Sequence, residues 1–157
     1  MVFISSASRF SSLTVSVILT QTDTTVGFLS HDEQKLCEIK SRQNSKSFIK
    51  VFKNFKTLKE SKYRIPNTFK NEVRRSKKIT YIIKGKAFRV AKSSLDSQLL
   101  RDLKWSFSTS ANETGKNFNR EFCEHKADII IENNEGLNER FSSNLYKLNL
   151  IKKRKLR

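Results

Sequence analysis

The chain has 157 residues, of which 36% are hydrophobic and 12 are Phe, a composition that fits one folded domain and excludes a disordered chain. Lys and Arg outnumber Asp and Glu by 32 to 15, and this net charge of +17 favours a polyanionic partner, although an AT-rich genome would also enrich Lys. No stretch approaches the ~20 apolar residues of a transmembrane helix, so we expect a cytoplasmic protein without a membrane partner.

The first half of the chain predicts an alternation of strands and short helices. Its β-branched residues predict a buried strand near Val15–Leu19. Ser30 and Glu33 have the spacing of a capping box, so a helix is expected to begin at His31 and end near Arg42. The same reasoning predicts a strand at 47–52, helices at 54–61 and 67–76, and a hairpin of strands at 79–85 and 86–92.

The second half predicts two further helices, at 94–105 and 117–126, each with apolar residues on one side. The Ile-rich stretch 127–133 predicts a central strand, and 144–151 predicts a final strand. Small polar residues fill "FSTSANETGK" at 107–116, which predicts a loop that either turns the chain or lets a ligand approach its backbone.

Interleaved strands and helices with adjacent strand pairs predict a single-domain α/β fold, a mixed, twisted open sheet flanked by helices. We expect this domain to occupy 13–150. An N-terminal extension or first element would precede it at 1–12. The basic residues 151–157 would form either a solvated, mobile tail or an RNA contact.

Cysteines and histidines give no sign of a metal site. Cys37 and Cys123 lack paired spacing, so buried thiols are expected. His31 and His125 are expected on helix surfaces, away from any set of three or four converging ligands. We therefore expect no protein-ligated metal and no nucleophile–base pair, and an enzyme of this sequence would act through positioning and charge.

Polar clusters follow the predicted strands, where ligands bind in open α/β sheets. Thr22, Asp23 and Thr24 suit the ammonium and hydroxyl groups of an amino acid, or they form an ordinary turn. Lys40 and Arg42 suit a polyphosphate, or they only complement the dipole of a helix.

A third cluster, Ser110-Ala111-Asn112 with Gly115, places small side chains and backbone N–H groups before a helix. That arrangement suits the approach of a phosphate or an adenine, and a simple capping loop is the alternative. The glycine-rich nucleotide motifs G-x-x-x-x-G-K-[ST] and G-x-G-x-x-G are absent from the sequence.

Together and in this order, the clusters resemble the YrdC-like family, the threonylcarbamoyl-AMP synthases. The matching stretches, within 15–148, are "QTDTTVGF" (21–28), "KSRQ" (40–43), "SKKIT" (76–80), "AFRVA" (87–91) and "SANETG" (110–115). The chain departs from the family pattern at Gln21, Val26 and Gln43, which replace Pro, Tyr and Pro, and at Ser76-Lys77-Lys78, which replaces Pro-Gly-Pro. The loss of these rigid residues predicts a looser pocket.

The resemblance implies a twisted sheet with a large basic concave surface. It also implies synthesis of threonylcarbamoyl-AMP and pyrophosphate from L-threonine, bicarbonate and ATP, with Mg²⁺ arriving on the nucleotide. Downstream transfer proteins would then use the product for the threonylcarbamoyladenosine modification of tRNA. The alternative is a non-catalytic protein of the same fold that binds double-stranded RNA or tRNA.

Residue roles follow from the same resemblance. Lys40 and Arg42 would be the catalytic residues. ATP binding is assigned to Lys40, Arg42, Thr80, Ser110 and Asn112, and threonine binding to Thr22, Thr24, Arg89, Ser108 and Ser143.

Overall fold

Nine strands form one sheet in the part of the chain that the computed structural model describes, which is residues 13–41, 47–92 and 95–157. Their bounds are β1 Ile18–Gln21, β2 Val26–Ser30, β3 Ile49–Phe52, β4 Ile79–Ile83, β5 Lys86–Val90, β6 Trp105–Ser110, β7 Ile129–Ile131, β8 Asn144–Leu148 and β9 Lys153–Lys155. The strands lie in the order β7-β1-β2-β6-β3-β5-β4-β8-β9. The pairs β1–β7, β3–β5 and β4–β8 are parallel, and the other neighbours are antiparallel, so the sheet is mixed.

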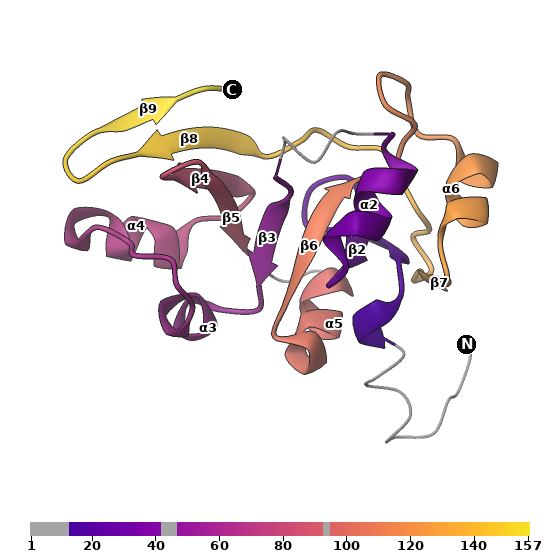
Figure 1. Ribbon diagram of the computed structural model, residues 1–157, viewed down its shortest axis with the longest axis horizontal. Helices are drawn as coiled ribbons and strands as arrows, with labels where there is room; N and C mark the ends of the chain where they lie inside the picture. Colours follow the sequence, from indigo (N-terminus) through magenta and orange to yellow (C-terminus); the bar gives the residue numbers. More distant parts are fainter. Residues whose placement is uncertain (1–12, 42–46, 93–94) are drawn as a thin grey trace.

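Helices flank this sheet on both faces (Figure 1). They are α2 Glu33–Ile39, α3 Phe55–Glu60, the 3-10 turn η1 Asn67–Phe69, α4 Lys70–Arg75, α5 Leu95–Leu103 and α6 Arg120–Lys126. The predicted fold class, a mixed α/β sheet flanked by helices, is confirmed, whereas its basic concave surface stays a prediction. None of the helices in the described ranges is long and apolar enough to span a bilayer.

Alternation of side chains along the strands divides the core between two faces. One face, which we call the helical face, carries Phe28 and Phe88 and is covered by α2, α6, α3 and α4. The opposite face, which we call the α5 face, carries Leu29, Val51 and Ala91 and packs against α5. Because α5 covers only part of its face, neighbouring strand residues there stay open to a ligand.

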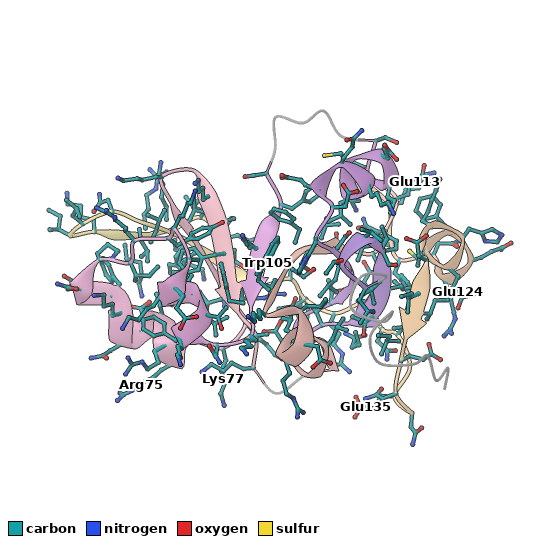
Figure 2. The ribbon with its side chains drawn as sticks, turned by 60° about the horizontal axis from the view of Figure 1, so that its bottom comes forward. Arg75, Lys77, Trp105, Glu113, Glu124 and Glu135 are labelled. Carbon is teal, nitrogen blue, oxygen red and sulfur yellow. The ribbon has the colours of Figure 1, made fainter. Side chains whose placement is uncertain are left out.

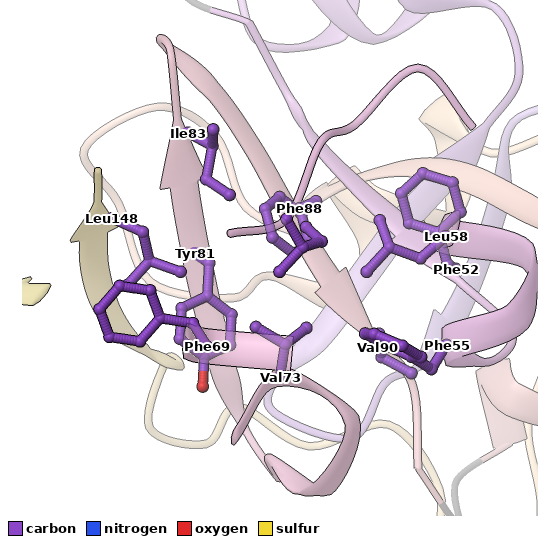
Figure 3. Packing of buried hydrophobic residues seen from close by; sticks show 11 residues of the cluster. Phe52, Phe55, Leu58, Phe69, Val73, Tyr81, Ile83, Phe88, Val90 and Leu148 are labelled. Atoms are coloured by element: carbon purple, nitrogen blue, oxygen red, sulfur yellow. The ribbon is translucent and has the colours of Figure 1, made fainter. Parts of the chain in front are cut away.

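The largest apolar cluster on the helical face joins α3, η1 and α4 to four strands (Figure 3). Tyr81 and Phe88 are almost fully buried, and their rings stack with centroids 5.8 Å apart. Burial of one such side chain stabilises a fold by about 1.5–3 kcal/mol, so this cluster fixes the position of β5 and of the residues on its other side.

The predicted start of the first helix is wrong. Ser30 ends β2, where it pairs with Phe107, so its backbone is not free to cap a helix. The N-cap is Asp32, whose side chain accepts hydrogen bonds from the backbone N–H groups of Gln34 and Lys35. His31 therefore precedes α2 and stacks on Trp105 with ring centroids 4.1 Å apart, instead of lying on a helix surface.

Two strands at the centre of the sheet were not predicted. β2 follows the Thr22–Thr24 cluster in a stretch for which no strand is predicted. β6 takes the last residue of the helix predicted at 94–105 and the first part of the loop predicted at 107–116. β6 alternates Trp105, Phe107 and Thr109 with Ser106, Ser108 and Ser110. The sequence has the period of two that is typical of a strand. However, its Ser residues are also typical of loops, so the strand is not recognised from the sequence.

Other strand predictions need smaller corrections. The strand expected near Val15–Leu19 begins only at Ile18, and the Ile-rich strand β7 is an edge strand instead of a central one. The basic tail is not simply a mobile end, because β9 pairs with β8. Predictions that are confirmed include β3, β8, the β4–β5 hairpin, the remaining helices, the buried Cys37 and Cys123 and the exposed His125. The segment predicted at 1–12 lies outside the described residues.

Candidate functional site

A polar cavity of about 290 Å³ opens on the α5 face, beside β2, β5 and β6. Six of the predicted site residues line it, namely Thr22, Thr24, Arg89, Ser108, Ser110 and Ser143. Predicted residues that are not among its lining are Lys40, Thr80 and Asn112, whereas Arg42 lies outside the described residues together with Gln43. The structure thus gathers all five predicted threonine-binding residues around one cavity.

Arg89 is the only cation of β5 that points into this cavity among the residues described. Its Nη2 lies 3.1 Å from Asp23 Oδ1, and its Nη1 donates a hydrogen bond to Thr24 Oγ1 at 3.1 Å. Burial raises the pKa of Asp23, while the positive charge of Arg89 acts in the opposite direction. The result is a buried pair whose arginine lines the cavity.

Several buried polar atoms around this pair have no hydrogen-bond partner. Within the described ranges they are Thr20 Oγ1, Gln21 Nε2, both carboxylate oxygens of Asp23 and Arg89 Nε. Of these, Asp23 Oδ1 is compensated by its ion pair with Arg89 Nη2. Proteins rarely leave such groups unsatisfied, because each costs about 1–3 kcal/mol. Of these residues only Arg89 lines the cavity, so a polar ligand there would complete the network at Arg89.

The segment between β1 and β2 is held by its own threonines. Thr22 Oγ1 donates a hydrogen bond to the carbonyl of Thr25 at 2.6 Å and accepts one from the backbone N–H of Thr24 at 3.1 Å. The Cβ of any side chain at Gly27 would lie 2.9 Å from Thr22 Cγ2 and 3.0 Å from the Thr109 carbonyl oxygen. Glycine at this position therefore allows the threonine turn to close over the strands.

Lys40 anchors the loop that follows β6. Its side chain is buried, and its Nζ donates hydrogen bonds to the carbonyls of Ser110 at 3.0 Å and Asn112 at 2.7 Å and to Asn112 Oδ1 at 2.8 Å. Ser110 Oγ also donates to Asn112 Oδ1 at 2.6 Å. In this conformation Lys40 fixes the shape of the loop, whereas its predicted catalytic role stays a prediction.

The far side of the cavity is closed by Ser143 and by a residue that sequence reasoning missed, Arg157. Ser143 Oγ lies 2.7 Å from Thr80 Oγ1, so Thr80 supports the wall from behind. Arg157 follows β9, lines the cavity, and its Nη2 donates to the Ser143 carbonyl at 3.3 Å. The run of basic residues at 151–157 gives no local signal that Arg157 lies at the cavity. Only the pairing of β9 with β8 brings it there.

The departures from the family pattern occupy defined positions in the fold. Gln21 Oε1 accepts a hydrogen bond from the backbone N–H of Asn138 at 2.8 Å, and Val26 is buried in the apolar cluster beneath α2. Ser76 ends α4 with its hydroxyl bonded to the Val73 carbonyl at 2.9 Å. Whether the pocket is looser than in the family stays a prediction.

No group of three His, Cys, Asp or Glu side chains that could hold a metal ion is found among the residues that the structure describes. The Cys123 thiol is buried, and burial raises its pKa, which suits a core residue better than a nucleophile. The arrival of Mg²⁺ with a nucleotide stays a prediction.

Comparison with known proteins places the chain by fold alone. No family model and no curated protein matches the sequence. A structure of E. coli YciO matches with a TM-score of 0.75 at 18% identity, covering 96% of this chain and 86% of that one. A P. abyssi Sua5 carrying two substitutions matches with a TM-score of 0.77 at 18% identity, covering 90% of this chain and 52% of that one.

A second P. abyssi Sua5 structure, described as complexed with L-threonine, matches with a TM-score of 0.75 at 19% identity. It covers 90% of this chain and 50% of that one, so the chain spans about half the length of the Sua5 proteins it matches. These likenesses confirm the YrdC-like fold.

Proposed function

We propose that this chain is a threonylcarbamoyl-AMP synthase. The amino group of L-threonine would combine with bicarbonate to form a carbamate, with loss of water. A carbamate oxygen would then attack the α-phosphorus of ATP, and the bond from that phosphorus to the bridging oxygen would break, releasing pyrophosphate. Such transfers rely on alignment and on neutralisation of charge, which residues of this type can supply without a catalytic triad.

One observation carries the proposal. Arg89, whose Nε has no acceptor among the described residues and whose Nη2 pairs with the buried Asp23, lines a cavity of about 290 Å³ together with Thr22 and Thr24. A cavity of this size and polarity suits an amino acid. Support comes from the fold, because a Sua5 protein of the same fold is described as complexed with L-threonine.

The threonine side of the cavity would use the residues around Arg89. Its guanidinium can take the threonine carboxylate, because Nε has no acceptor among the described residues. Thr22 and Thr24 would hold the substrate hydroxyl or ammonium group, with Ser108 and Ser143 completing the wall.

The phosphates would use two further lining residues. Ser110 and Arg157 both line the cavity and can face an anion. Lys40 would keep the loop at Asn112 in place, and Thr80 would support Ser143. Arg42 is assigned to the leaving phosphates by the family resemblance alone.

Calorimetric titration with L-threonine tests the proposal at the cavity beside Arg89. Thr24→Val keeps the shape of the side chain but removes the hydroxyl that Arg89 contacts, and we expect a loss of at least tenfold in affinity, about 1.4 kcal/mol. Thr68→Val, on the exposed turn η1, is the matched control and should bind as the parent does. Absence of L-threonine binding by the folded parent protein in the presence of ATP and bicarbonate would refute the assignment.

A second candidate is a non-catalytic protein of this fold that binds double-stranded RNA or tRNA. The chain has 32 Lys and Arg but only 15 Asp and Glu, and this positive charge favours RNA binding. It predicts no threonine binding and an RNA affinity that falls steeply with salt. Cytoplasmic location and contact with downstream transfer proteins stay predictions under either function.

A further inference from the structure

Charge is unevenly distributed along the chain and across the fold. Residues 47–92 contain 15 Lys or Arg and two Glu, whereas residues 113–140 contain four Lys or Arg and seven Asp or Glu. Figure 2 shows the consequence, with Arg75 and Lys77 at one end and Glu113, Glu124 and Glu135 at the other. Such a molecule attracts a polyanion to the end that contains α3 and α4.

Two grooves flank α3 at this end. The first has a volume of about 800 Å³, contains one carboxylate, Glu60, and is lined by the cations Lys53, Lys56, Lys59, Arg74 and Lys92. The second has a volume of about 660 Å³, contains Glu33 and Glu60, and is lined by the cations Lys50, Lys62, Lys86 and Lys104. We call these nine cations, together with α3, the α3 band.

The cations of the α3 band have no carboxylate partners in the described ranges. Three of them lie over aromatic rings instead. Lys50 Nζ is 3.6 Å from the centroid of Trp105, the guanidinium of Arg74 is 4.9 Å from that of Phe55, and Lys86 Nζ is 5.9 Å from that of Tyr63. Burial, with a smaller effect of the nearby Lys86, lowers the pKa of Lys50. An anion between these ammonium groups would offset the repulsion between Lys50 and Lys86.

The acidic end behaves differently. Arg120 Nε lies 2.6 Å from Glu124 Oε1, and its Nη2 lies 2.9 Å from Glu132 Oε2. Charges there neutralise one another locally. The acidic end is therefore an ordinary solvated surface with ion pairs of its own. The α3 band differs from it, because its positive charges are not neutralised by carboxylates in the described ranges.

We propose that the α3 band is a docking surface for the phosphate backbone of a nucleic-acid strand. Regularly spaced phosphates suit cations that line two successive grooves on either side of a helix, and the second groove also offers Tyr63, Trp105 and Phe107 beside those cations. The first groove shares no lining residue with the polar cavity, and the second shares only Ser47, Phe48 and Ala87 with it. This inference does not rest on the proposed synthase activity.

An anionic membrane is the alternative polyanion for the α3 band. The positions of the exposed apolar residues argue against membrane binding. Peripheral membrane binding combines basic residues with apolar anchors. The large hydrophobic residues that are exposed in the described ranges are Val15, Ile130, Phe141, Leu150, Ile151 and Leu156, and none of them lines either groove. The α3 band therefore offers charge and aromatic rings but no anchor for a bilayer.

The test measures binding of a fluorescein-labelled 20-nucleotide single-stranded RNA by anisotropy across a range of salt concentrations. Lys56→Gln with Lys59→Gln removes two exposed cations of α3. If each contacts one phosphate, affinity at 0.1 M salt should fall roughly 25-fold, and the slope of log K against log salt should shrink by about 1.4. Lys116→Gln with Lys126→Gln, at the acidic end, removes the same charge and should leave both values unchanged.

Trp105 gives a second readout, because it is the only tryptophan of the chain. RNA that draws Lys50 away from the ring should change the emission of the parent protein, and the Lys56/Lys59 variant should need roughly 25-fold more RNA for the same change. Equal RNA binding by the two double variants would overturn the proposal, as would absence of RNA binding by the parent. So would binding to phosphatidylserine vesicles, but not to RNA, that depends on Lys56 and Lys59.

Discussion

Arg89 and Asp23 form an ion pair in which Nη2 lies 3.1 Å from Oδ1 while both side chains are only 4% exposed. The two residues are 66 positions apart in the sequence, and the fold brings Asp23 to Arg89, which lines the polar cavity. A pair this deeply buried is costly to desolvate, so its presence at the cavity fits a functional role better than a stabilising one.

Arg89→Met should destabilise the protein by about 3–5 kcal/mol at neutral pH, because it leaves the carboxylate of Asp23 buried without its cation. Urea unfolding measures the loss. The double variant Asp23→Asn with Arg89→Met buries no charge and should recover a large part of it. A single variant as stable as the parent would contradict the buried pairing.

Lys40→Met should release the loop at 110–116, since it removes three hydrogen bonds from one ammonium group. Hydrogen bonds to charged groups contribute about 1.5–3 kcal/mol, so amide hydrogen exchange in this loop should accelerate at least tenfold. Lys147→Met, on the exposed side of β8, is the control. Unchanged exchange in the Lys40 variant would show that the loop holds its shape alone.

Gly27→Ala should distort the turn of Thr22, because its Cβ would lie only 2.9 Å from Thr22 Cγ2 and 3.0 Å from the Thr109 carbonyl oxygen. We expect a stability loss of about 1–3 kcal/mol together with weaker binding of L-threonine. Gly85→Ala is the matched control, since a φ of +76° makes alanine cost about 1–2 kcal/mol there, in the hairpin that joins β4 to β5. Equal threonine affinity in the two variants would argue against a role for the turn.

Tyr81 should make stability sensitive to alkaline pH. Burial, with smaller effects that include Glu72, raises the pKa of its phenol to about 12 from the ordinary 10.0. The folded state then keeps a proton that the unfolded state loses, so the contribution of this group is complete below pH 10 and declines as pH rises toward 12. Urea unfolding at pH 9 and pH 11 should show a smaller loss for Tyr81→Phe than for the parent, and equal losses would contradict the raised pKa.

The sequence predicts the helices and the apolar strands of this fold well, because their patterns are strong and local. Leu100 and Leu103 mark α5, and the β4–β5 hairpin is visible from its two apolar runs around Gly85. β2 and β6 are the failures. β6 alternates its aromatic residues with Ser, and β2 is short, contains Gly27 and directly follows a run of Thr. Both are central strands whose neighbours in the sheet are not revealed by any local pattern.

Candidate site residues are predicted from their motifs, but their partners are not. Thr22, Thr24 and Ser110 were found from clusters of polar residues, whereas the pairing of Arg89 with Asp23 depends on strands that are distant in sequence. Arg157 was missed because a basic run has no periodicity, and only pairing of β9 with β8 returns it to the cavity.

Release of pyrophosphate from ATP by the purified protein tests the central claim most directly. Release should require both L-threonine and bicarbonate, and Thr24→Val should lower it while Thr68→Val does not. Release that requires both substrates and follows this order of variants would support a synthase built around Arg89 and its neighbours. No release from folded protein that is free of contaminating ATPase would contradict the claim.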